Sequence, residues 1–101
     1  MEWRNDKVEG AMRVETDLEF AGLVAGPVTV ASGATLHLTG MAASLWVEPG
    51  ATAVVRGTVT DAALNAGGHL EIYGTVGSTR DVAASALTQI MPGAIVDGIR
   101  K

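Results

Sequence analysis

The chain has 101 residues and a net charge of −4; 48% of its residues are hydrophobic but only 4% are aromatic, and it has no cysteine. At this length we expect one domain with an aliphatic core, without a disulfide framework or a thiolate metal site. No apolar run approaches the roughly 18 residues that cross a bilayer, and the charged first twenty residues do not suit a secretory signal. We therefore expect a cytoplasmic protein that does not bind membranes.

The acidic residues are concentrated at the start of the chain, whereas Arg56 and Arg80 are the only basic residues between Phe20 and Gly98. Nucleic-acid binding needs a clustered basic surface, so no nucleic-acid partner is expected. A net negative charge is compatible with a basic protein partner. Six of the eleven acids lie in the first nineteen residues: Glu2, Asp6, Glu9, Glu15, Asp17 and Glu19.

Residues 1–16 carry Trp3, Val8, Met12 and Val14 among charged neighbours. Because this segment precedes the regular part of the chain, we expect an N-terminal cap that covers the first coil.

Residues 17–78 repeat with a nearly constant period. Gly22, Gly40, Gly57 and Gly74 are spaced by 18, 17 and 17 residues, and a second set of glycines, at 33, 50 and 67, keeps a spacing of 17. A constant period is typical of a solenoid, in which equivalent residues stack coil over coil. An antiparallel sandwich does not require such a spacing. We therefore predict an all-β, single-domain parallel β-helix with four to five coils of about 17–18 residues.

Apolar residues alternate within each period, which predicts strands with one buried face, separated by glycine turns. Three short strands per coil would form a triangular prism with a solid core. The positions predicted to face inward are Leu18, Phe20, Leu36, Leu38, Ala53, Val55, Leu70 and Ile72 on the first face, Val24, Ala42, Val59 and Val76 on the second, and Val28, Val30, Leu45, Val47, Ala62 and Leu64 on the third.

Residues 79–101 break the pattern. Asp81 stands where an inward residue is expected, and the "MPGA" of 91–94 repeats the "EPGA" of 48–51 out of phase. We expect an irregular last coil and a C-terminal cap. Uncovered coil ends would expose unpaired backbone groups and favour stacking.

The coil "GTVTDAALNAGGHLEIYGTVGS", together with its neighbours from Leu18 to Ser78, resembles those of the bactofilins, bacterial cytoskeletal proteins that form polymers. This resemblance implies right-handed coils whose ends associate into filaments.

The sequence offers little for catalysis. His37 and Glu71 are both predicted to face outward in one column, two coils apart, which is about 9–10 Å and too far for a hydrogen bond. The hexapeptide pattern and protruding loop of β-helical acyltransferases are missing, and "NAGGH" and "VASGA" suit coil corners better than phosphate loops. We expect no enzyme, cofactor or metal site.

The outward positions favour protein binding. Trp46, Met41, Leu23, Arg56 and Tyr73 are predicted to be exposed in a region with few charges, and such residues are enriched in protein interfaces. Isolated exposed apolar residues are also ordinary. The candidate partner-binding set, with the two polar residues of the outward column, is Trp46, Met41, Leu23, Arg56, Tyr73, His37 and Glu71.

Two functional hypotheses follow. The first is a non-catalytic β-solenoid that binds and neutralises a protein partner, as an immunity protein or antitoxin would neutralise a basic bacterial toxin; acidic charge would speed the encounter. The alternative is a bactofilin-like scaffold that self-associates through its coil ends.

Overall fold

The computed structural model describes residues 2–5, 7–83 and 86–100, and these contain strands but no helix. The short-strand sheet has the order β1-β4-β6-β8-β10-β12, and the long-strand sheet has the order β14-β13-β11-β9-β7-β5-β2, with β3 also paired to β5. The bounds in the short-strand sheet are β1 (Glu2–Arg4), β4 (Leu18–Phe20), β6 (Thr35–Leu38), β8 (Thr52–Val55), β10 (His69–Ile72) and β12 (Leu87–Ile90). Those in the long-strand sheet are β2 (Lys7–Val8), β3 (Met12–Val14), β5 (Leu23–Val30), β7 (Met41–Val47), β9 (Thr58–Asn65), β11 (Thr75–Asp81), β13 (Ile95–Val96) and β14 (Ile99–Arg100).

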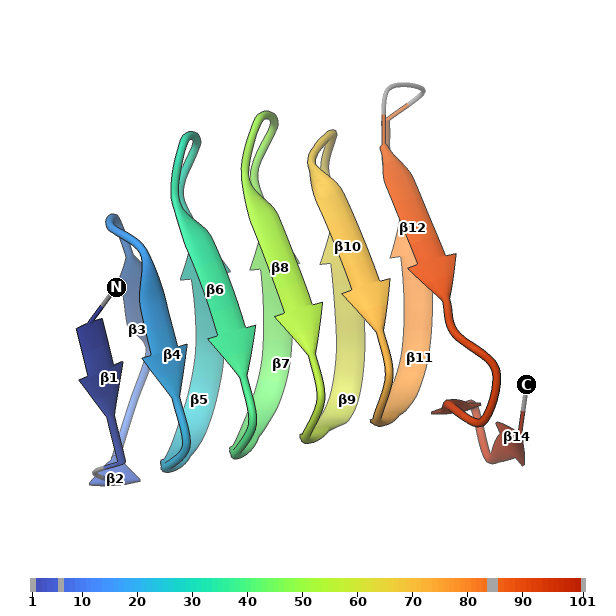
Figure 1. Ribbon diagram of the computed structural model, residues 1–101, viewed down its shortest axis with the longest axis horizontal. Coiled ribbons are helices and arrows are strands. Elements are labelled where there is room, and N and C mark those ends of the chain that lie inside the picture. Colours follow the sequence, from blue (N-terminus) through green and yellow to red (C-terminus); the bar gives the residue numbers. More distant parts are fainter. Residues whose placement is uncertain (1, 6, 84–85, 101) are drawn as a thin grey trace.

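The chain forms a parallel β-solenoid of about five turns. Short and long strands alternate along the sequence and form two facing layers, with the chain ends at opposite ends of the stack (Figure 1). Neighbouring coils pair in parallel: Leu36 lies in register with Ala53, and Ala53 with Leu70. These 17-residue offsets confirm the predicted fold class.

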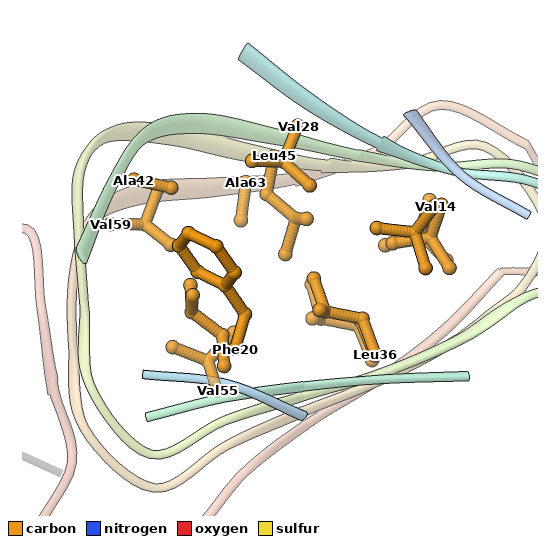
Figure 2. Packing of buried hydrophobic residues seen from close by; sticks show 14 of the residues in the cluster. Val14, Phe20, Val28, Leu36, Ala42, Leu45, Val55, Val59 and Ala63 are labelled. Carbon is orange, nitrogen blue, oxygen red and sulfur yellow. The ribbon is translucent and has the colours of Figure 1, made fainter. Parts of the chain in front are cut away.

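A solid aliphatic core fills the space between the two sheets. The side chains of Phe20, Leu36, Val55 and Leu45 point toward one another from both layers (Figure 2) and are at most 1% exposed. Burying a side chain of this size stabilises the fold by about 1.5–3 kcal/mol. Columns of like residues therefore hold the coils together, as the alternation predicted.

The second and third predicted faces belong to one continuous strand in each of the middle coils. An irregularity marks the corner between them, as at Val24/Pro27 in β5. The residues on either side of this corner point inward, Val24 before it and Val28 after it. The prism thus has three faces made from two strands per coil.

The number of residues at this corner alternates along the stack. Between paired positions, β7 has one residue fewer than either neighbour, β5 or β9, and β11 has one fewer than β9. Coils with a wide corner therefore flank the coil of β7.

This extra residue overturns one prediction. In β9, Ala63 and Asn65 face inward and are fully buried, whereas Ala62 and Leu64 face outward. Leu45 lies in register with Ala63, an offset of 18 residues instead of 17. A shift of one residue exchanges the two sides of a strand, so the expected inward placement of Ala62 and Leu64 is wrong.

Asn65 is the one buried polar side chain among the described residues, and all its hydrogen-bonding groups are used. Its Oδ1 accepts from the backbone N–H of Gly67 (3.2 Å) and of Gly68 (2.8 Å). Its Nδ2 donates to the carbonyl of Leu87 (2.9 Å) and to Thr88 Oγ1 (3.1 Å). The side chain thus ties its own corner to the next coil.

The two glycine columns have different physical causes. At Gly57 an added Cβ would overlap the carbonyl oxygen of Gly40 in the coil below. Gly50 has open space around it but a φ of +80°, which L residues rarely adopt. The column that contains Gly57 allows close stacking of the coils, and the column that contains Gly50 allows the chain to turn between strands.

The two sheets end differently at the C-terminal side. Leu87 to Ile90 of β12 pair with β10 and form the outer strand of the short-strand sheet. The long-strand sheet is closed by β13 and the antiparallel β14. In the predicted caps, Met1, Asp6, Ala84, Ser85 and Lys101 lie outside the described residues.

Candidate functional site

The structure separates the seven candidate residues instead of gathering them on one flat face. Leu23, Met41 and Trp46 belong to the long strands. The other four lie on the short-strand side of the solenoid: His37 and Glu71 are within β6 and β10, and Arg56 and Tyr73 directly follow β8 and β10. The corners at Gly40, Gly57 and Gly74 separate the two sets.

Trp46 lies beside an apolar neighbour that sequence reasoning had placed inside. The register pairs Thr29, Trp46, Leu64 and Arg80 in one outward column across β5, β7, β9 and β11. Trp46 is 36% exposed, and Leu64 is half-buried. This outward-facing Trp–Leu pair on adjacent strands is the apolar centre of this side.

Small residues lie next to this pair along the strands. Ser44 and Ala62 occupy the preceding outward positions of β7 and β9 and are half-buried. Short side chains leave the indole and the Leu64 side chain as the largest groups near the centre. We call the outward residues Thr29, Ser44, Trp46, Ala62, Leu64 and Arg80 the Trp46 face.

Charged residues mark both ends of the Trp46 face, because Arg80 is its last residue on β11 and Arg13 lies beyond Thr29 on β3. Arg13 continues the column beyond Thr29, and its Nη1 and Nη2 each lie 3.3 Å from one carboxylate oxygen of Glu48. Hydrogen bonds to Glu48, and then to Glu15, raise the pKa of Arg13. Exposed pairs of this kind contribute little to stability, but they give the apolar centre a polar rim.

A small apolar depression lies beside the Trp46 face at the narrow corner of β7. It has a volume of about 230 Å³, which is below the roughly 300 Å³ at which small-molecule sites begin. The hydroxyl of Thr60 donates a hydrogen bond to the carbonyl of Ala43 (3.3 Å), which also lines the depression. The lining residues are Leu23, Val24, Ala25, Met41, Ala42, Ala43 and Thr60.

The depression follows from the alternating corner. Ala43 lies on the narrow corner of β7, between the wider corners that carry Ala25 in β5 and Thr60 in β9. Leu23 (37% exposed) and Met41 (42% exposed) lie in register beside it.

A polar cluster occupies the short-strand sheet. His69 Nε2 lies 2.7 Å from Glu71 Oε2, and the hydroxyl of Tyr73 donates to Glu71 Oε1 at 3.1 Å. The Arg56 guanidinium lies over the Tyr73 ring, 4.4 Å from its centroid. We call these four residues the Arg56 cluster.

The sequence pattern assigns His69, the last residue of "NAGGH", only to a coil corner and does not predict its contact with Glu71. The signal was present, because His69, Glu71 and Tyr73 are two residues apart and successive outward positions of a strand share one side. His37 does not join them, since Val54 lies between His37 and Glu71 in register.

The cluster holds Glu71 as a carboxylate. Hydrogen bonds from His69 and from Tyr73 keep the pKa of Glu71 below its ordinary value of 4.5, with a further contribution from the Arg56 charge. The same bond to Glu71 raises the pKa of Tyr73. Both carboxylate oxygens are already engaged, so Glu71 is poorly placed to act as a general base.

The described residues contain no group of three or more His, Asp or Glu side chains that could hold a metal ion. They also contain no helix that is long and apolar enough to cross a membrane.

The fold defines a β-solenoid repeat protein with an outward-facing Trp–Leu pair on its long strands. No family model, curated protein or solved structure matches the chain. The bactofilin resemblance therefore remains an expectation from the repeat alone.

Proposed function

We propose that this chain is a non-catalytic protein-binding β-solenoid that contacts its partner through the Trp46 face and the neighbouring depression. The observation that carries the proposal is the Trp46–Leu64 pair, which faces outward on adjacent strands and is flanked by charged residues. An apolar centre with a charged rim is the usual anatomy of a protein interface.

The energetic contribution of this face would come mainly from Trp46. Tryptophan is enriched among interface residues whose truncation costs at least about 2 kcal/mol. Met41 and Leu23 would add a smaller contact through the depression, which accepts a side chain of the partner.

The net charge of −4 favours a basic partner, because opposite charges accelerate encounter and disfavour acidic competitors. Neutralisation of a basic bacterial toxin, as by an immunity protein or antitoxin, is the specific role that we propose for this binding. It requires only that the solenoid cover a functional surface of the toxin.

Affinity capture from the source cells, followed by titration calorimetry with the captured protein, tests the proposal. We expect Trp46→Asp to weaken binding at least about 30-fold, the equivalent of 2 kcal/mol, while circular dichroism and the unfolding midpoint stay unchanged. Leu87→Asp, a matched change at an exposed leucine of the short-strand sheet, should leave binding intact. If the two variants bound the partner with equal affinity, the Trp46 face would not be the binding surface.

The toxin-neutralising role has its own test. Expression of the captured partner in a bacterial host should arrest growth, and co-expression of this chain, but not of its Trp46→Asp variant, should restore growth. A partner that is harmless when expressed alone would rule out this role and leave protein binding in place.

A second candidate is a scaffold that polymerises through its coil ends, and the C-terminal edge favours it. The outer strand β12 has no further strand beside it among the described residues, and Leu87 and Val82 near this edge are 47% and 45% exposed. An uncovered strand edge offers backbone groups to another chain.

A further inference from the structure

We propose that the Arg56 cluster is a second binding site, which takes a single carboxylate group of a peptide, either a chain terminus or an acidic side chain. It lies on the short-strand sheet and is independent of the Trp46 face. The proposal begins with Arg56, one of two basic residues between Phe20 and Gly98.

The Arg56 guanidinium is held in position, and its charge is near enough to the Glu71 carboxylate to help lower the pKa of Glu71. It lies over the Tyr73 ring, while no hydrogen bond or ion pair joins it to any described residue. The contact with the ring occupies no N–H group in a hydrogen bond, so these donors are available to a ligand. A planar fork of donors matches a carboxylate in a bidentate way.

The rest of the cluster holds the Tyr73 ring in place. The Tyr73 hydroxyl donates to Glu71 Oε1, and the other oxygen of Glu71 is engaged by His69. This chain of contacts turns the only nearby carboxylate of the cluster toward His69 and Tyr73. A side chain held in its binding conformation loses less entropy when the ligand arrives.

The number of donors in the cluster selects the class of anion. One guanidinium stands near one carboxylate, whose pKa is lowered. The planar fork of one guanidinium can satisfy both oxygens of a carboxylate, whereas the cluster offers no second cationic donor for the further charged oxygens of a phosphate. The donor set therefore favours a carboxylate over a phosphate.

NMR titration of the arginine side-chain Nε–H signals tests the proposal, with N-acetylglycine as the probe at low salt. We expect a saturable shift of the Arg56 signal, and none with the uncharged N-acetylglycinamide. Arg80 is the matched control, because it is also exposed and lacks a partner among the described residues. Affinity at Arg56 should exceed that at Arg80 about two- to tenfold, because the Tyr73 ring already holds the Arg56 side chain in place and less entropy is lost on binding.

Substitution of Tyr73 shows whether carboxylate binding depends on the positioning of Arg56 by the aromatic ring or on the arginine charge alone. Tyr73→Leu should reduce the affinity of Arg56 to that of Arg80, while Tyr73→Phe, which keeps the ring, should retain part of the difference; backbone spectra verify the fold of each variant. The proposal is overturned if Arg56 and Arg80 respond alike, if Tyr73→Leu has no effect in a folded protein, or if inorganic phosphate binds more tightly than the carboxylate.

Discussion

Asn65 shows how much a single side chain can contribute at a coil corner. It is fully buried, yet its four hydrogen bonds satisfy two backbone N–H groups, one carbonyl and the Thr88 hydroxyl. An apolar side chain of similar size would leave these groups without partners in the core, at a cost of about 1–3 kcal/mol for a buried group.

We therefore expect Asn65→Leu to lower the free energy of unfolding by about 2–4 kcal/mol, measured by urea denaturation. Gln89→Leu changes an exposed amide in the same sheet region and should alter stability by less than about 0.5 kcal/mol. Similar effects of the two substitutions would contradict the role of Asn65.

The lowered pKa of Glu71 predicts how the free energy of unfolding depends on pH. Its pKa is lowered in the folded protein, so its stabilising contribution is complete above its ordinary pKa of 4.5 and is lost as the pH falls through the folded value. We expect the difference in unfolding free energy between wild type and Glu71→Gln to be constant above about pH 5.5 and to shrink below pH 4.5. A difference that stays constant down to pH 3 would show that the hydrogen bonds to His69 and Tyr73 do not favour the charged form.

At the scale of the coil, the glycine column that contains Gly40, Gly57 and Gly74 sets the distance between the stacked coils. A Cβ at Gly57 would overlap a carbonyl of the coil below, whereas a Cβ at Gly10 would meet no atom within 4 Å. Close stacking of the coils therefore depends on Gly57 and not on Gly10.

Gly57→Ala should destabilise the protein by about 3 kcal/mol or more or prevent folding, because the backbones of two coils must separate. Gly10→Ala should stay within about 0.5 kcal/mol of wild type. Thermal unfolding followed by circular dichroism measures both, and a stable Gly57→Ala variant would be inconsistent with this stacking.

The repeat predicted the short-strand sheet well and the third face only in part. Leu36, Ala53 and Leu70 keep a constant offset of 17, so their column could be predicted from spacing alone. The extra residue of β9 could not be assigned to a corner from the sequence, and this shift brought Leu64 outward beside Trp46. The predicted candidate site therefore included Trp46 but lacked the apolar neighbour that the register places beside it.

At the scale of the whole molecule, the solenoid separates its possible contacts by face and by end. The Trp46 face lies on the long strands, the Arg56 cluster on the short-strand sheet, and the β12 edge at the C-terminal end. Each surface can be altered without disturbing the others, because the core lies between the sheets (Figure 2).

Self-association can therefore be tested separately from partner binding. If the β12 edge mediates assembly, sedimentation should show polymers that Leu87→Lys suppresses and Trp46→Asp does not. A monomer at all concentrations would exclude the scaffold, and polymers that dissolve only in the Trp46→Asp variant would assign assembly to the long strands instead.

The proposed function depends most on the shifted register that places Leu64 beside Trp46 on the outside of the solenoid. Nuclear Overhauser spectroscopy of methyl-labelled protein measures this contact directly. We predict cross-peaks between the indole protons of Trp46 and the methyl groups of Leu64, and none from those methyl groups to the buried side chains of Leu45 and Val47. Cross-peaks to the buried pair and none to the indole would place Leu64 inside and contradict the proposed face.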